Sequence, residues 1–200
     1  MEKVISIVGA GGKTTLVHKL AREYHRRGKG VLVTTTTHMY VEADTDLSCD
    51  FFALRDKIIK DGYCMAGQKI SGQKISEQSK MCGLPNDLLD KLIKDMPQAL
   101  DYVIIEADGA KHHSLKYPAA DEPVIYLGTT DVIIVLGTWE KGRPCKDVVF
   151  RYELMQKELG TAENAVVDDS VIDTLRQVYV RKLRDSGFEG RILSCLAKNC

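Results

Sequence analysis

The stretch ISIVGAGGKTT, residues 5–15, constrains the fold of this chain more than any other part of the sequence. An apolar run rich in β-branched residues, from Val4 to Val8, predicts a strand, and three glycines interrupt it. From Thr14 onward, apolar residues recur at the spacing of a helix. Glycines let backbone N–H groups approach an anion closely, and a helix start adds unpaired N–H donors. The stretch therefore predicts a strand, a phosphate-binding loop and a helix.

The loop has the short form G-x-x-G-K-[ST], because the first glycine of the usual longer form would fall on Ile7, within the strand. Lys13 would neutralise phosphate charge, Thr14 would ligate Mg²⁺ through its hydroxyl, and Thr15 would bond a phosphate nearer the base. The candidate nucleotide-binding residues are Gly9, Ala10, Gly11, Gly12, Lys13, Thr14 and Thr15.

The glycines of this loop allow two other interpretations. Gly9 and Gly11 also give the G-x-G of a dinucleotide-binding turn, but that turn needs Gly or Ala where Thr14 stands. It also needs an acidic residue at the end of the second strand, where this chain has threonines at 34–37. We reject that interpretation. A glycine turn that binds nothing is the other alternative, and the complete order of strand, Gly-Lys-Thr-Thr and helix argues against it.

Length and composition indicate a globular domain with a sizeable core. Two hundred residues fit a single domain, 1–200, whose clearest patterns lie before about residue 150. The 28 basic and 28 acidic side chains cancel, which gives no indication of nucleic acid or an anionic membrane as a partner. With no signal peptide and no run of membrane-spanning length, a cytoplasmic protein is expected.

The six cysteines are scattered without a C-x-x-C pair. This spacing predicts reduced thiols that fill apolar space, and favours neither a disulfide framework nor a zinc site. A cysteine that acts as a nucleophile or as an acceptor of a sulfur group is the alternative.

A second strand is predicted at residues 31–33 and runs into four threonines and a histidine. Strand, helix and strand form the unit of a parallel sheet, in which ligands bind at the carboxyl ends of the strands. There Thr36 or Thr37 would complete a magnesium shell or meet a terminal phosphate, or would simply be extended chain. His38 would act as a base or ligand, or would be a solvated loop histidine.

The most apolar strand, predicted at residues 102–105, ends in two carboxylates, Glu106 and Asp108. Because side chains alternate along an extended chain, both would face the same way. They would hold magnesium through water or activate a nucleophile, and the alternative is a turn with solvated acids. The catalytic candidates are Lys13, Glu106 and Asp108, and the metal-binding candidates are Thr14, Glu106 and Asp108.

Cationic and titratable residues follow that strand, among them Lys111, His113 and Lys116. The two lysines would neutralise a second anionic substrate or the charge that develops on a transferred phosphoryl group. Metal binding by the adjacent histidines is an alternative without support from other ligand spacings. Other predicted elements are a hairpin or loop in the duplicated GQKIS segment at 67–76, helices at 52–61, 85–96, 152–159 and 171–184, and strands at 63–66, 132–136 and 192–195.

Three segments together resemble the YqeC family of selenium-dependent hydroxylase accessory proteins, also described as selenium cofactor biosynthesis proteins. They are VGAGGKTT at 8–15, VTTTTHM at 33–39 and EADGAKHHSLKYPAADEPVI at 106–125. The third is the most specific. The chain departs from the family's pattern at residues 150–153, Phe-Arg-Tyr-Glu, where the family tends to have a histidine-arginine pair, and in the tail after Cys195.

The resemblance implies a P-loop NTPase-like protein that assists a selenium-dependent molybdenum hydroxylase or its cofactor. The short loop also resembles that of Mur-type amide ligases, in which ATP activates a carboxylate. The predicted fold is a three-layer α/β domain with a mainly parallel β-sheet flanked by helices, which would bind ATP or GTP with Mg²⁺. Three functions stay open: a hydrolase of nucleoside triphosphates, a non-catalytic nucleotide-gated binding module, and a small-molecule ligase or kinase.

Overall fold

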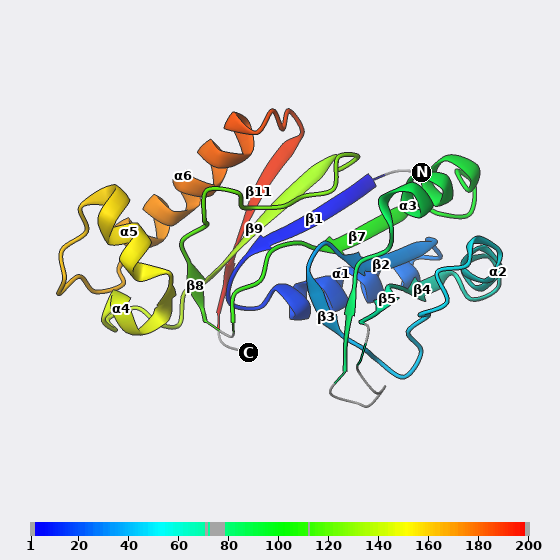
Figure 1. Ribbon diagram of the computed structural model, residues 1–200, viewed down its shortest axis with the longest axis horizontal. Helices are drawn as coiled ribbons and strands as arrows, with labels where there is room; N and C mark the ends of the chain where they lie inside the picture. The colour runs from blue at the N-terminus through cyan, green and yellow to red at the C-terminus, as the bar shows by residue number, and fades with distance from the viewer. Residues whose placement is uncertain (1–2, 71, 73–78, 112, 199–200) are drawn as a thin grey trace. The chain divides into compact units, whose positions relative to one another are not determined.

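Strands and helices are interspersed along the chain (Figure 1). A computed structural model describes residues 3–70, 72, 79–111 and 113–198. The strands are β1 (Lys3–Gly9), β2 (Val31–Thr35), β3 (His38–Tyr40), β4 (Tyr63–Met65), β5 (Gln68–Lys69), β6 (Lys80–Cys82), β7 (Tyr102–Glu106), β8 (Leu115–Lys116), β9 (Asp131–Gly137), β10 (Val149–Phe150) and β11 (Arg191–Ala197). The helices are α1 (Lys13–Arg26), α2 (Phe51–Asp61), α3 (Asn86–Asp95), α4 (Cys145–Val148), α5 (Tyr152–Leu159) and α6 (Asp169–Asp185).

The main sheet has six strands in the hydrogen-bonded order β11-β9-β1-β7-β2-β4. Strand β2 pairs in parallel with both β4 and β7, and the register places Thr35 opposite Glu106. The predicted α/β fold with a mainly parallel sheet flanked by helices is confirmed. The threonine tract and the acidic end of β7 therefore lie on neighbouring strands, an order that the sequence did not predict.

The chain divides into two compact units, and β1 contributes residues to both. Unit 1 comprises Met1–Ser6, Thr14–Ala107 and Ile125–Asp131, and unit 2 comprises Ile7–Lys13, Asp108–Val124 and Val132–Cys200. The number of domains stays a prediction.

Within unit 1, helices cover both faces of the β2 and β7 pair. Side chains on one face of β7, Val103 and Ile105, belong to an apolar cluster with residues of α2 and α3 such as Leu54 and Leu92. Tyr102 stacks its ring on Tyr24 of α1, with 3.9 Å between the centroids. Because successive strand side chains point to opposite faces, α1 lies on the face opposite α2 and α3. This gives unit 1 three layers.

Within unit 2, β9 is almost entirely buried, and α6 packs through one apolar face. Helix α6 begins where the side chain of Asp168 accepts a hydrogen bond from the backbone N–H of Val171, which satisfies one of the free donors at a helix start. Its buried residues recur at helical spacing and are Ile172, Leu175, Val178, Tyr179 and Leu183. Strand β8 pairs in parallel with β10, which brings the segment after β7 beside Phe150.

The helices predicted at 52–61, 85–96, 152–159 and 171–184 are confirmed, with ends shifted by a few residues. The structure adds the small antiparallel sheet of β3, β6 and β5, the pair of β8 and β10, and the short helix α4. These elements have two to four residues, too few to show a hydrophobic period. Much of the segment predicted as a hairpin at 67–76 lies outside the described residues. No helix in the described part of the chain combines the length and apolar character needed to cross a membrane.

Candidate functional site

The loop between β1 and α1 can be built only with glycine at two of its positions. Gly9, Gly11 and Gly12 have φ of 95°, 76° and 105°, in the region that residues with side chains rarely adopt. A Cβ atom on Gly9 would lie 2.2 Å from the carbonyl oxygen of Val135, and one on Gly11 would lie 2.5 Å from that of Ser114. The loop therefore packs tightly against β9 and the segment that contains Ser114.

The opposite side of this loop is open. A Cβ atom on Gly12 would meet nothing closer than 3.6 Å, and Gly12, Thr14 and Thr15 are exposed. The first turn of α1 contains no acidic residue. A helix start of this kind, with free N–H groups and no negative side chain, is suited to an anion.

Lys13 is the first residue of α1 and is 7% exposed. Its ammonium donates a hydrogen bond of 2.9 Å to the carbonyl oxygen of Gly9, at the other end of the loop. The positive charge of Lys13 therefore lies beside the loop whose N–H groups would hold a phosphate.

Thr14 and Glu106, both in unit 1, form a direct hydrogen bond. The Thr14 hydroxyl donates to Oε2 of Glu106 over 2.7 Å, and Glu106 is 8% exposed. A hydroxyl beside a carboxylate offers the oxygen donors that Mg²⁺ prefers. In the described part of the chain, no group of three or more His, Cys, Asp or Glu residues could hold a metal. These two residues therefore fit a magnesium ion whose other ligands are phosphate and water, and do not fit an all-protein metal site.

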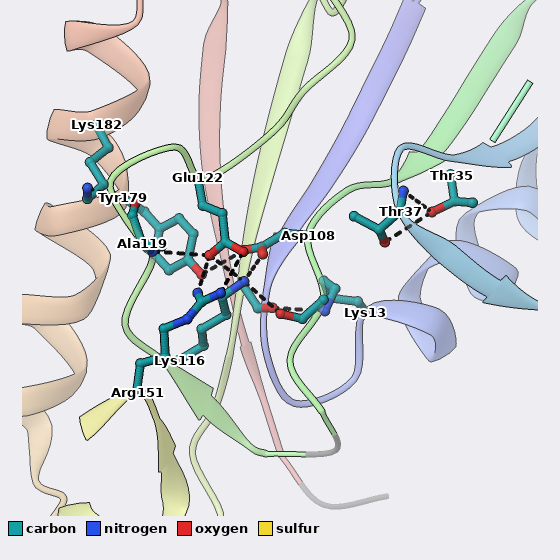
Figure 2. Close-up of polar contacts among 12 residues, drawn as sticks. Lys13, Thr35, Thr37, Asp108, Lys116, Ala119, Glu122, Arg151, Tyr179 and Lys182 are labelled. Atoms are coloured by element: carbon teal, nitrogen blue, oxygen red, sulfur yellow. Dashed lines mark hydrogen bonds and ion pairs between the residues drawn. The ribbon is translucent and has the colours of Figure 1, made fainter. Parts of the chain in front are cut away.

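The threonine tract holds the main chain at the end of β7. The Thr35 hydroxyl donates to the carbonyl oxygen of Glu106 over 2.6 Å and accepts from the N–H of Thr37 over 3.0 Å. The N–H of Thr36 donates to the same Glu106 carbonyl over 3.1 Å. Figure 2 shows the backbone nitrogen and the hydroxyl of Thr37 on the side of Thr35. Thr36 and Thr37 are half-buried, while His38 is exposed at the start of β3.

Asp108 and Lys116, both in unit 2, form an ion pair with no exposed side-chain surface. The Lys116 ammonium also donates to the carbonyl oxygen of Gly109 over 2.6 Å, and Tyr179 donates to Oδ2 of Asp108 over 2.9 Å. Both carboxylate oxygens of Asp108 therefore have partners. The sequence placed Asp108 at a metal and Lys116 at a second substrate, whereas the structure pairs them with each other.

Glu122 completes this buried network on the other side of Lys116 (Figure 2). Its carboxylate lies 2.8 Å from the Lys116 ammonium and pairs with both terminal nitrogens of Arg151. Burial opposes the charge of Glu122, but the hydrogen bonds from Arg151 and Lys116 outweigh it and lower the pKa of Glu122 from 4.5 to about 2. Burial lowers the pKa of Lys116 to about 8, against the opposing effect of Glu122.

Phe150 lies among cationic side chains of unit 2. Its ring centroid is 4.7 Å from the Arg151 guanidinium carbon, 5.4 Å from the Lys111 ammonium and 6.0 Å from that of Lys116. The His113 ring stacks on it at 5.5 Å. Each of these distances is within or near the range for interactions with an aromatic ring.

The predicted residues thus fall into two sets. Unit 1 brings Thr14, Glu106 and the threonine tract together, and unit 2 holds the glycine loop with Lys13 and the network around Lys116. Sequence reasoning missed Glu122, Arg151 and Tyr179 as partners of the network. Glu122 lies inside the most specific of the three motifs, and Arg151 lies where the chain departs from the family's pattern, so both positions had been singled out without a role.

A model of the YqeC protein family matches residues 5–153. The chain is 34% identical over 142 residues to a protein of Escherichia coli (strain K12) described as uncharacterized protein YqeC. The aligned region is 67% of this chain and 51% of that relative, so the chain spans about half the length of the curated relative it matches. The family match covers both the glycine loop and the segment from Glu106 to Arg151. The chain belongs to the YqeC family.

Proposed function

We propose that this chain binds ATP or GTP with Mg²⁺ at the glycine loop and hydrolyses it as a cytoplasmic accessory protein in the maturation of selenium-dependent molybdenum hydroxylases. The hydrogen bond from Thr14 to Glu106 is the observation that carries the nucleotide part. A threonine that follows the loop lysine meets the carboxylate of a buried strand, which is the pairing that a magnesium-bound triphosphate requires.

Each residue has a role that follows from its contacts. The N–H groups of the loop and the α1 start would hold the phosphates, and Lys13 would neutralise them from its position over the loop. Thr14 and Glu106 would hold Mg²⁺, which supplies neutralisation of the charge on the terminal phosphates. Thr35 fixes the main chain of Glu106, so the carboxylate enters the site from a rigid strand end. Of the two acids, Glu106 is the one that would orient a water nucleophile.

The hydroxylase part of the proposal rests on the family alone. The second candidate function is a nucleotide-gated binding module that escorts a partner enzyme without turnover. The buried pairing of Asp108 with Lys116 and Tyr179 favours this second function. Of the two acids at the end of β7, it leaves only Glu106 without an ion pair in the described chain, so a single carboxylate is available both to hold Mg²⁺ and to orient water. A ligase or kinase is the third candidate, and requires an acceptor that accelerates phosphate release.

Calorimetric titration of ATP and of GTP, with and without Mg²⁺, tests the proposal. The wild type is expected to bind one of them in a magnesium-dependent way, and Lys13→Ala is expected to abolish binding. Lys19→Ala, an exposed lysine on the same helix, is the matched control and should bind as the wild type does. Undiminished affinity in a folded Lys13→Ala variant would refute the proposed site. Phosphate release by the wild type then separates the hydrolase from the binding module.

A further inference from the structure

The cationic side chains around Phe150 do more than cancel the neighbouring acids. Arg151 is matched by Glu122, and Lys116 lies between Asp108 and Glu122. Lys111 is exposed and contacts the face of Phe150, and in the described part of the chain no acid forms an ion pair with it. Lys111 therefore gives this cluster a surplus positive charge at its exposed side.

A buried hydroxyl without a partner lies in the same segment. Ser114 is 5% exposed, and among the described residues its Oγ has no hydrogen-bond partner. An unsatisfied buried hydroxyl is destabilising, so such groups usually have a partner. A ligand that supplies an acceptor oxygen would satisfy it.

Ser114 also joins this segment to the glycine loop. Its carbonyl oxygen accepts a hydrogen bond of 3.0 Å from the N–H of Gly137 and lies where a side chain on Gly11 would be. His113, the preceding residue, is half-buried and stacked on Phe150. Lys111 and His113 therefore contact Phe150 of the cationic cluster, and Ser114 lies at the edge of the phosphate loop.

The backbone around the cluster is held in an uncommon conformation. Asp108, Lys111 and Arg151 have φ of 82°, 44° and 63°, and they are three of the four non-glycine residues with positive φ in the described chain. Such conformations are unfavourable and persist where the surroundings require them, often at ligand sites.

We propose that Lys111, His113 and Ser114 form a second anion site beside the glycine loop, which binds a small oxyanion, a carboxylate or a phosphate group. Lys111 supplies the charge, His113 a ring N–H donor, and Ser114 a hydroxyl donor. The ring of Phe150 contacts both the Lys111 ammonium and the His113 ring, and so holds these two side chains near each other. The idea that this site holds the acceptor in a nucleotide-driven reaction rests on the proposed function. Anion binding at the site can be tested independently of that function.

The histidine ring signals in NMR spectra are a direct readout, because the chain has five histidines and His113→Asn identifies the relevant signal. Inorganic phosphate and acetate are titrated separately, at constant ionic strength set with chloride, in the presence of Mg²⁺ and a non-hydrolysable ATP analogue. A saturable shift of the His113 signal is expected, and the stronger of the two responses identifies a phosphate or a carboxylate as the ligand class.

Three variants decide whether the named residues make the site. Lys111→Gln should weaken phosphate or acetate binding about tenfold, which is the loss expected for one charge-assisted hydrogen bond. Ser114→Ala should also weaken it, and Lys157→Gln, an exposed lysine on α5, should leave it unchanged. An absent shift, an equal response to chloride, or equal affinity in Lys111→Gln would overturn the proposal.

The same titration on Lys13→Ala separates this inference from the proposed function. A His113 response that survives in that variant supports the second site even where calorimetry finds no nucleotide binding. A response that disappears in Lys13→Ala would overturn the proposal, because the phosphate would then be bound by the glycine loop and not by Lys111, His113 and Ser114.

Discussion

Two carboxylates leave the end of β7 two positions apart, and they meet different surroundings. Glu106, in unit 1, contacts the hydroxyl of Thr14 and has no ion pair in the described part of the chain. Asp108, in unit 2, has both carboxylate oxygens engaged, one by the Lys116 ammonium and one by the Tyr179 hydroxyl. Two acids at the end of the same strand therefore differ in role: Glu106 is available to a ligand, whereas Asp108 is part of the ion-pair network around Lys116.

The comparison shows that partners decide the role of a carboxylate more than its place on a strand does. A metal ion at Asp108 would have to displace Lys116, which would leave a buried ammonium with one carboxylate fewer. A metal ion at Glu106 would displace only a neutral hydroxyl, and Thr14 could itself become a ligand. The network of unit 2 is thus a support for the segment after β7, and the pair in unit 1 is the candidate for chemistry.

Replacement of Lys116 by methionine is expected to have the largest effect. Removing the cation leaves the fully buried Asp108 carboxylate without its ion-pair partner and takes from Glu122 one of its two cations, which should lower the free energy of unfolding by about 3–5 kcal/mol. Urea unfolding followed by circular dichroism measures the loss. Lys146→Met, an exposed lysine of the same unit, is the control and should change stability by less than about 0.5 kcal/mol. If Lys116→Met lowers the free energy of unfolding by less than about 1 kcal/mol, the network does not stabilise the fold.

Acid should weaken the same network through Glu122. The pKa of Glu122 is lowered on folding from 4.5 to about 2, so its contribution is complete above pH 4.5 and is lost as the pH falls towards 2. A shift of this size corresponds to about 3 kcal/mol. The difference in unfolding free energy between wild type and Glu122→Gln should therefore shrink between pH 6 and pH 3. The exposed Glu153→Gln is the control, and a difference independent of pH would contradict the assignment.

A pair of isosteric substitutions tests the comparison of the two acids directly. Glu106→Gln should keep the fold and reduce the magnesium-dependent part of nucleotide affinity about 10- to 100-fold, or about 1.4–2.7 kcal/mol. Asp108→Asn should instead lower stability by about 1.5–3 kcal/mol, because it weakens hydrogen bonds to a charged group, and should leave the affinity of the folded protein nearly unchanged. Calorimetry measures the nucleotide affinity of each variant, and urea unfolding measures its stability. Lost affinity in Asp108→Asn together with lost stability in Glu106→Gln would reverse the roles of the two acids.

The parts that the sequence predicted correctly are those with a local cause. The strand, glycine turn and helix at residues 5–15 follow one another along the chain, and so do the strand and threonines at 31–37. The polar residues at the ends of β2 and β7 were expected at the carboxyl edge of a parallel sheet, and the pairing of these strands in the structure places Thr35 opposite Glu106. Alternation along an extended chain also predicted that Glu106 and Asp108 share a direction, but Asp108 has a φ of 82°, so the alternation ends there.

The parts that the sequence could not predict depend on contacts between distant segments. Lys116 is neutralised partly by Glu122, which is nearby in the chain, but Arg151 and Tyr179 come from the start of α5 and from α6. A lysine that follows an acidic turn has the sequence features of an exposed substrate ligand, and only the tertiary packing shows that its side chain is fully buried. Charge type is visible in a sequence, whereas solvent exposure of a single charged residue is not.

The smallest expected effect concerns Ser114, the buried residue of the proposed second anion site. Ser114→Ala removes a buried hydroxyl that has no partner among the described residues, and should leave stability unchanged or raise it by up to about 1 kcal/mol. Ser6→Ala is the matched control, because the Ser6 hydroxyl is equally buried but bonds to that of Thr129 over 2.8 Å, and it should lose about 1 kcal/mol. Urea unfolding without added phosphate compares the two. An equal loss in both variants would mean that Ser114 already has a partner within the protein, and the hydroxyl would then no longer indicate a ligand beside the glycine loop.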